Sequence, residues 1–249
     1  MKQYLIDADI VAFKAAAATE RPINWGDGLW TLHGYEHEAI DYVNLYLSSI
    51  VNTLGDGELR LFLTDKDNWR KEILGTYKMG RGETRKPLLL PFLREWMIDC
   101  CDAAVWPTME ADDLLGIIAT SEDDCIIVSE DKDLRTIPAL VYNPAKDTAP
   151  KLFTEFDAAY NHMFQTLVGD KTDNYDGCPT VGPVGAHKVL EKAKTIDDLW
   201  PIVVKTFAKK NLSEAVALQQ AQVARICHAS DYDFIKRKVI PWTPSTPTK

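Results

Sequence analysis

Residues 110–133, EADDLLGIIATSEDDCIIVSEDKD, read as a helix followed by a short buried strand. The stretch 111–120 has helical periodicity, and Cys125 to Val128 is a short apolar run of the kind found in sheet interiors. Acidic residues open the helix and follow the strand. Ligands of open α/β sheets bind at the carboxyl ends of the strands, so these acids indicate a functional site.

The same pattern extends to both sides of this segment. Further apolar runs predict strands at Tyr4-Leu5-Ile6, Leu59 to Leu63, Ala103 to Trp106 and Leu140 to Tyr142. Helical periodicity predicts helices over 37–54, 87–99 and 155–167, the second opened by Pro87, and a helical stretch from about 195 through Ser230. Strands that alternate with helices favour an α/β fold with a central, mostly parallel sheet flanked by helices.

Composition excludes several classes of protein. The chain has 249 residues with 26% charged residues, and no apolar run approaches the length that spans a bilayer, so no membrane role is expected. The first residues, MKQYLIDADIVAF, carry two aspartates in their apolar stretch and are interpreted as a first strand rather than a secretory signal, which favours the cytoplasm. The five cysteines form no CxxC pair and are expected to be free thiols.

The net charge of −9 is unusual for a protein that binds nucleic acid. Ten of the 37 acidic residues lie in a few clusters, which leaves 27 acids against 28 bases elsewhere. The clustered acids are Asp7, Asp9, Asp65, Glu110, Asp112, Asp113, Asp131, Asp133, Asp170 and Asp173. Outside these clusters the chain is close to neutral.

Acids from separate strand ends are expected to meet at one edge of the sheet. Like charges about 4 Å apart repel by about 4 kcal/mol per pair at an effective dielectric constant of 20, so such a cluster needs a compensating cation. Oxygen ligands favour Mg²⁺ or Mn²⁺, and the number of acids suggests two ions. A pair of divalent ions is typical of enzymes that hydrolyse phosphodiesters, whereas each acid alone could equally be a solvated residue or a helix cap.

Two segments predict contacts with nucleic acid. Residues 168–190 read as a helix end, a glycine-rich turn and a new helix, whose exposed backbone N–H groups at Gly182 and Gly185 could hold phosphate without reading bases. Between Lys66 and Arg94 there is a local excess of bases. The candidate DNA-binding residues are Lys78, Arg81, Arg85, Lys86, Gly182, Gly185, His187 and Lys188.

Candidate catalytic residues lie in the same basic stretch. Lys78 and Arg81 could hold the scissile phosphate and offset charge in the transition state, and Tyr77 could stack on an unpaired base. Arg70 is a further candidate. A solvated basic loop is the alternative interpretation of this stretch.

The motifs, taken in order, resemble the 5′-nuclease or flap endonuclease superfamily. They are IDAD (6–9), an aspartate with YKxxR (65 and 77–81), EADD (110–113), SEDKD (129–133) and GDxxDN (169–174). The chain is short and is similar to stand-alone bacteriophage-type 5′-to-3′ exonucleases. Such enzymes hydrolyse DNA near 5′ ends, flaps or nicks during replication or repair.

The resemblance implies specific roles. Nine acids match the family's metal-site acids: Asp7, Asp65, Glu110, Asp112, Asp113, Asp131, Asp133, Asp170 and Asp173. Lys78 and Arg81 match catalytic bases of a helical arch, whereas Asp9 has no assigned role. The family pattern also implies a helix-three-turn-helix module that binds duplex DNA and a potassium ion, although Thr180 stands where the family usually has glycine.

These expectations define a domain organisation. Residues 1–150 would form the catalytic core, with an arch or clamp at about 76–100, and residues 151–235 the DNA-binding region and C-terminal helices. Residues 236–249 would form a flexible tail, and residues 20–36 a loop or hairpin without an assigned purpose. A monomer is expected.

Two other hypotheses stay open at this point. Asp7-Ala-Asp9-Ile10 after a strand also resembles the nucleophile motif of haloacid-dehalogenase-like phosphatases, but that hypothesis leaves the other acidic motifs without a role. A catalytically inactive protein that binds DNA structures is the second, although every acid position is filled. The sequence leaves open the preference for exonuclease or flap cutting, the use of RNA–DNA hybrids, and the protein partners.

Overall fold

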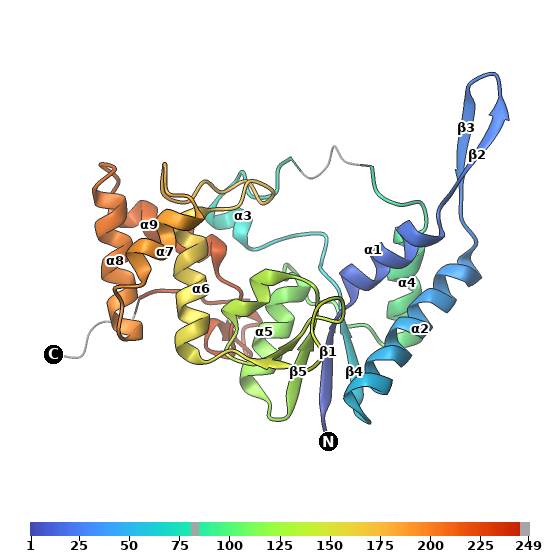
Figure 1. The fold of residues 1–249 in the computed structure, drawn as a ribbon, viewed down its shortest axis with the longest axis horizontal. Coiled ribbons are helices and arrows are strands. Elements are labelled where there is room, and N and C mark those ends of the chain that lie inside the picture. The colour runs from blue at the N-terminus through green and yellow to red at the C-terminus, as the bar shows by residue number, and fades with distance from the viewer. Residues whose placement is uncertain (81–84, 245–249) are drawn as a thin grey trace.

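A five-stranded sheet in the order β4-β1-β5-β6-β7 forms the centre of the molecule (Figure 1). β1 (Gln3–Asp7), β4 (Glu58–Phe62), β5 (Cys125–Val128) and β6 (Leu140–Tyr142) are parallel, and β7 (Lys151–Leu152) is antiparallel to β6. The computed structural model describes residues 1–80 and 85–244. The prediction of an α/β fold with a mostly parallel sheet is confirmed.

Helices cover both faces of this sheet. Successive residues of β1 point to opposite sides, and apolar residues on both sides need to be buried. Tyr4 and Ile6 pack with α1 (Ala8–Thr19), α2 (Glu36–Leu54) and α4 (Leu90–Cys101). Leu5 packs on the other face with α5 (Ala111–Ser121). β1 is therefore buried on both faces, as its continuous apolar run requires.

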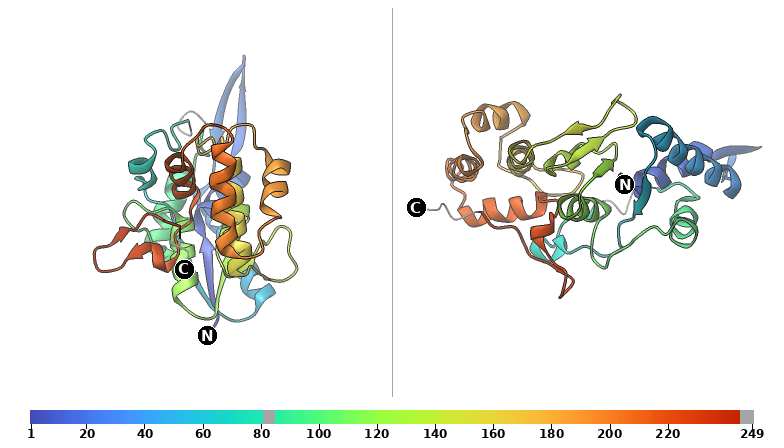
Figure 2. Two further views of the ribbon diagram at one scale, coloured as in Figure 1. Left: turned by 90° about the vertical axis from the view of Figure 1, so that its left-hand side faces the viewer. Right: turned by 90° about the horizontal axis from the view of Figure 1, so that it is seen from below.

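A second group of helices lies beside the sheet and has its own apolar core. It contains α6 (Glu155–Val168), α7 (Pro183–Leu190), α8 (Ile196–Ala208) and α9 (Glu214–Ala224). Figure 1 and the right-hand view of Figure 2 show these helices on the side of the molecule away from α2. The chain then returns to the sheet, because Ile226 and Cys227 pack with α5.

The remaining elements are short. They are the hairpin of β2 (Arg21–Gly26) and β3 (Leu29–His33), the helix α3 (Arg70–Ile73), the 3₁₀ turns η2 (Lys132–Thr136) and η3 (Ala229–Asp231), and the pair β8 (Tyr232–Asp233) and β9 (Lys238–Val239). Figure 1 shows the β2–β3 hairpin projecting away from the body of the molecule. No helix in the described ranges is long and apolar enough to cross a membrane.

Two predicted elements in the first half of the chain differ from the structure. Residues 103–106 form no strand but a single bridge between Phe62 and Ala104, because Asp102 is left-handed and Pro107 has no N–H to donate. The helix predicted at 87–99 begins at Leu90, with Pro91 rather than Pro87 in its first turn.

The C-terminal prediction also needs correction. The helices end at Ala224, and residues 225–228 are extended. Part of the segment expected to be a flexible tail is ordered, since β9 pairs with β8 and the Trp242 ring contacts those of His162 and Trp200. Residues 245–249 lie outside the described ranges.

Candidate active site

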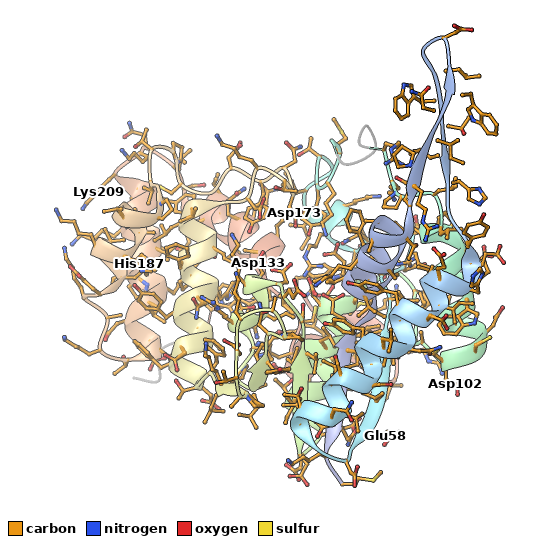
Figure 3. The ribbon with its side chains drawn as sticks, turned by 45° about the vertical axis from the view of Figure 1, so that its right-hand side comes forward. Glu58, Asp102, Asp133, Asp173, His187 and Lys209 are labelled. Atoms are coloured by element: carbon orange, nitrogen blue, oxygen red, sulfur yellow. The ribbon has the colours of Figure 1, made fainter. Side chains whose placement is uncertain are left out.

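Six of the predicted acids line one cavity of about 330 Å³, which they reach from three separate segments. They are Glu110, Asp112, Asp131, Asp133, Asp170 and Asp173. Asp131 and Asp133 follow the carboxyl end of β5, and Glu110 and Asp112 open α5. Figure 3 shows Asp133 and Asp173 well above Glu58, which begins β4 at its amino end.

Local hydrogen bonds fix the acids of β1 and β5 next to each other. Asp7 ends β1 and caps α1, since its Oδ1 accepts a hydrogen bond from the Ile10 N–H at 3.3 Å. Its other oxygen accepts a 2.8 Å hydrogen bond from the Ser129 hydroxyl, which in turn accepts one from the Asp131 N–H at 3.0 Å. Ser129 therefore links the two strand ends.

A tight loop after α6 carries Asp170 and Asp173. The loop is closed by the bridge between Asp170 and Tyr175. Gly169 and Gly177 both have positive φ, and a Cβ on either would lie 2.4 Å from a backbone atom of the opposite side of the loop. Only glycine allows the two sides to approach so closely.

Burial and mutual repulsion disfavour the charged form of several carboxylates in and beside the cavity. Burial raises the pKa of Asp112 well above its ordinary value, and the neighbouring Asp7 and Asp131 raise it further. Burial also raises the pKa of Asp7 to about 6, and that of Asp133 to about 6. The site therefore lacks positive charge that would match its acids.

The potential metal ligands in the cavity are carboxylate oxygens, which hard divalent cations such as Mg²⁺ prefer. Acidic side chains outnumber basic ones in the cavity wall. Among residues 1–80 and 85–244, no group of three Asp, Glu, His or Cys side chains is already arranged around one point. Lys78 occupies part of the space instead: its ammonium group contacts Glu110 and lies 3.7 Å from Asp173 Oδ2. A bound ion would compete with Lys78 for these carboxylates.

The backbone holds Lys78 in an uncommon conformation. Its φ of 55° is left-handed, which costs roughly 1–2 kcal/mol for a residue with a side chain. The Lys78 N–H donates to Asp173 O at 2.8 Å, and Asn174 Nδ2 donates to Thr76 O at 2.7 Å. Strain that the surrounding structure maintains is a frequent property of functional sites.

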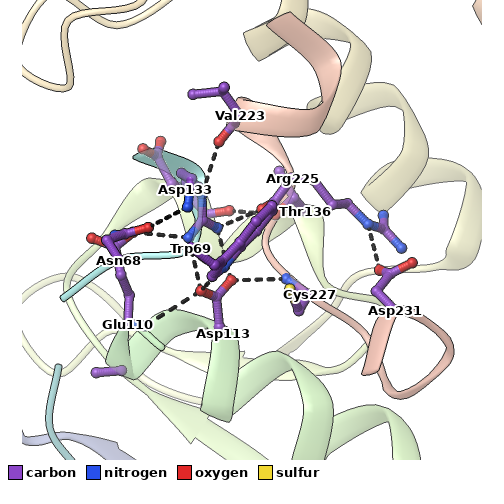
Figure 4. Close-up of polar contacts among 12 residues, drawn as sticks. Asn68, Trp69, Glu110, Asp113, Asp133, Thr136, Val223, Arg225, Cys227 and Asp231 are labelled. Atoms are coloured by element: carbon purple, nitrogen blue, oxygen red, sulfur yellow. Dashed lines mark hydrogen bonds and ion pairs between the residues drawn. The ribbon is translucent and has the colours of Figure 1, made fainter. Parts of the chain in front are cut away.

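Asp113 forms a buried ion pair with Arg70, which also lines the acidic cavity. Figure 4 labels Asp113 with two further partners, Trp69 and Cys227. Both Asp113 oxygens accept 2.7 Å hydrogen bonds from Arg70, and they also accept from Trp69 Nε1 and the Cys227 N–H. Arg70 also donates to Glu110 and to the carbonyl groups of Val223 and Arg225. The ion pair thus engages both side chains with each other. The roles of Asp113 as a metal ligand and of Arg70 as a catalytic residue stay predictions.

Tyr77 is buried and lines the acidic cavity, and its stacking on an unpaired base stays a prediction. Its hydroxyl lies 3.0 Å from Glu110 Oε2 and 2.9 Å from Asp173 Oδ2. Burial raises the pKa of Tyr77, which keeps the phenol protonated as a donor between the two carboxylates. Tyr77 thus holds two cavity acids from different segments in place.

A second, basic cavity of about 600 Å³ adjoins the acidic one, and Lys78 and Glu110 line both. Its other walls include Lys66, Lys71, Lys86 and Arg94, together with Phe13 and Leu90. Asp65 lies here rather than among the six acids, and its carboxylate accepts a 2.7 Å hydrogen bond from the Thr108 N–H. Arg85 is exposed and pairs with Glu20, and the predicted residue Arg81 lies outside the described ranges.

The predicted DNA-binding turn joins α6 to α7. Gly182 caps α7, and a Cβ at this position would meet no neighbouring atom, so the helix start is open. Gly185 lies in the first turn of α7, Lys188 is exposed, and the His187 ring packs against Phe164 with Nδ1 2.9 Å from the Tyr160 hydroxyl. The role of these residues in DNA binding stays a prediction.

One residue of the site was missed from the sequence. Ser129 opens the SEDKD motif, and its position at a strand end between two acids was the available signal. Asp9 was noted without a role, and the structure pairs it with Arg94.

Comparison with known proteins identifies the family. The model of the "5′-3′ exonuclease, N-terminal resolvase-like domain" matches residues 2–151. The chain belongs to the 5′-3′ exonuclease family. The protein is a phage-type 5′-nuclease, an enzyme whose nuclease function depends on metal. This assignment excludes the phosphatase hypothesis.

Relatives match this 5′-nuclease along most of its length. The exodeoxyribonuclease of Enterobacteria phage T3 is 27% identical, with 96% of this chain and 92% of that protein covered. The exonuclease of Escherichia phage T7 is 26% identical, with 96% and 93% covered.

Solved structures confirm the fold. The bacteriophage T5 5′-exonuclease with bound zinc has a TM-score of 0.66 at 16% identity, over 90% of this chain and 88% of that one. The T5 D15 flap endonuclease in complex with DNA and metal ions has a TM-score of 0.64 at 16% identity, over 90% and 89%.

Proposed function

We propose that this 5′-nuclease hydrolyses DNA phosphodiesters near 5′ ends, flaps or nicks, with the scissile phosphate at the junction of the acidic and basic cavities. The observation that carries the proposal is the shared wall of the two cavities, where Lys78 and Glu110 meet. A phosphate at this wall can approach oxygen-bound cations on one side and lysines on the other. Primer or flap removal in the cytoplasm of a bacterial or phage-infected cell is the biological role that fits.

Six acids would hold two Mg²⁺ or Mn²⁺ ions: Asp7, Glu110, Asp112, Asp131, Asp133 and Asp173. Asp170, in the same cavity, and Asp65, in the adjoining basic cavity, would support them. When bound, such ions polarise the phosphodiester and supply an activated water. The raised pKa values of Asp7, Asp112 and Asp133 support this assignment, because uncompensated buried carboxylates gain most from a cation.

Lys78 contributes a positive charge beside the scissile phosphate. Its backbone is held by the bond from its N–H to Asp173 O and by the bond from Asn174 to Thr76 O, so the ammonium group can remain near the reacting atoms when a metal ion binds Glu110. The segment 76–100, which includes Arg81 and α4, would act as an arch or clamp over the 5′ strand. Lys86 and Arg85 would contact phosphates on this side.

The α6–turn–α7 module would hold the duplex on the other side of the cavity. The open N-terminus of α7 at Gly182 and Gly185 suits backbone contacts to phosphate, with His187 and Lys188 on the same helix. A potassium ion in this turn belongs to the same proposal. We propose a monomer, with RNA–DNA hybrids as a second substrate to be tested.

A matched pair of variants tests the metal site. Asp131→Asn removes a charge at the carboxyl end of β5, whereas Asp123→Asn removes an exposed charge just before its amino end. We expect Asp131→Asn to abolish Mg²⁺-dependent cleavage and retain DNA binding, and Asp123→Asn to retain both. Full cleavage by Asp131→Asn would refute the assignment of the metal site.

A further inference from the structure

Asp9 and Arg94 form an ion pair at the wall of the basic cavity, outside the cluster of six acids. Asp9 lies in the first turn of α1, directly after the strand that carries Asp7. Arg94 comes from α4, some 85 residues further along the chain. The pair therefore joins two helices, α1 and α4, that both contribute to the wall of the basic cavity.

The same two side chains also hold the backbone of Thr64. The Thr64 N–H donates to Asp9 Oδ2 at 2.8 Å, and Arg94 Nη2 donates to Thr64 O. Both polar groups of one peptide residue are thus bound by the two members of the pair. Charged partners make these hydrogen bonds stronger than neutral ones.

Thr64 in turn connects two acids of the site. Asp65 follows it directly, and the Thr64 hydroxyl accepts a 3.0 Å hydrogen bond from the Ala111 N–H. Ala111 lies between Glu110 and Asp112 at the start of α5. A displacement of Thr64 would therefore move Asp65 and the acidic end of α5 relative to Asp7.

We propose that Asp9 and Arg94 are positioning residues that set the spacing of the metal-site acids through Thr64. Asp9 would then serve as the anchor of this linkage rather than as a metal ligand. The inference rests on the proposed function. It predicts that removing the ion pair lowers kcat and Mg²⁺ affinity without lowering DNA affinity.

A second ion pair provides a matched control. Arg60 and Glu122 join β4 to the end of α5 at 2.7 Å, with side chains about as exposed as those of Asp9 and Arg94. Arg60 and Glu122 lie towards the amino end of the sheet, away from the acidic cavity. Arg60→Gln thus reports what the loss of a comparable pair does to stability alone.

The experiment compares Arg94→Gln, Asp9→Asn, their combination, Arg94→Lys and Arg60→Gln. We would measure kcat and KM on a 5′-flap duplex, Mg²⁺ affinity by calorimetry, DNA affinity without divalent metal, and Tm. We expect Arg94→Gln and Asp9→Asn to lower kcat by about 10-fold to 100-fold and to weaken Mg²⁺ binding several-fold, with DNA affinity unchanged. The double variant should be little worse than either single one, and Arg94→Lys should recover part of kcat.

Other outcomes would overturn the inference. One is a kcat for Arg94→Gln equal to that of Arg60→Gln, and another is a loss confined to KM with unchanged Mg²⁺ affinity. An inactive wild-type protein would instead refute the proposed function, so the two failures are distinguishable. The calorimetric measurement needs no turnover and reports on the acids directly.

Discussion

The ammonium group of Lys78 contacts the carboxylate of Glu110 at the wall between the acidic and the basic cavity. Burial opposes ionisation of Glu110, but Arg70 and Lys78 lower its pKa below the ordinary value. The carboxylate is therefore charged and available to a metal ion. Lys78 in turn is held where a substrate phosphate would meet it.

Replacing Lys78 with methionine should lower the chemical step by a factor of about 100 or more, because a preorganised charge at the reacting phosphate is lost. DNA affinity should fall only slightly, since one contact among many disappears. Single-turnover cleavage and DNA titrations without metal would separate the two effects. As a control, Lys14→Met removes a lysine paired with Glu130 outside both cavities. Equal cleavage rates for the two variants would contradict the role of Lys78.

Thr180→Gly should stabilise the fold by about 1 kcal/mol. Thr180 has a φ of 65°, a left-handed conformation that costs a residue with a side chain roughly 1–2 kcal/mol. Glycine would avoid this cost, but it also makes the unfolded chain more flexible, which offsets part of the gain. Thr180→Ala keeps a Cβ and should show no comparable gain. Urea unfolding of the three proteins is the measurement. A destabilised Thr180→Gly would mean that the threonine side chain makes a favourable contribution to the turn.

Arg70→Met should destabilise the protein by about 3–5 kcal/mol, because Asp113 would remain as a buried charge without its partner. The exposed pair of Arg21 and Glu38 is the control, and Arg21→Gln should cost less than about 1 kcal/mol. Denaturant unfolding gives both values. A small effect of Arg70→Met would show that Asp113 takes up a proton or finds another donor.

Stability should depend on pH through His162. Burial lowers the pKa of His162 to about 3 in the folded protein. In the unfolded chain the imidazole binds a proton near pH 6.5, whereas in the folded protein it stays neutral down to about pH 3. This contribution is complete above pH 6.5 and is lost as pH falls towards 3. Between pH 7 and 5 it amounts to roughly 2 kcal/mol.

His162→Gln should remove this part of the pH dependence, while the amide can still donate to the Ala221 carbonyl that His162 Nε2 contacts at 2.8 Å. His37→Gln, at an exposed position, should leave the dependence as in the wild type. Urea unfolding at pH 7 and pH 5 gives the comparison. An unchanged slope in His162→Gln would assign the dependence to other groups.

The sheet could be predicted from the sequence because β1, β5 and β6 contain continuous apolar runs, which parallel strands buried on both faces require. The apolar run of the edge strand β4 is interrupted by Arg60. Locally, the run at 103–106 looks like those of β1, β5 and β6. Its failure to pair depends on the left-handed Asp102 and on Pro107, which limit it to one bridge with Phe62. The antiparallel strand β7 has only two residues and no readable pattern.

The acids of the site could be predicted as a group but not individually. Asp112 and Asp113 are neighbours in sequence, yet successive residues of a helix point about 100° apart, so one lines the cavity and the other faces Arg70. That distinction depends on a partner 43 residues away, which no local pattern reveals. The roles of Tyr77 and Asp9 depend on similarly distant contacts.

Cleavage of a 5′-flap duplex labelled at either end, with and without Mg²⁺, tests the central claim most directly. We expect products released from the 5′ side only when the metal is present, short ones for exonuclease action and flap-length ones for endonuclease action. Tight binding without cleavage at any Mg²⁺ or Mn²⁺ concentration would contradict the claim and leave a protein that only binds DNA structures.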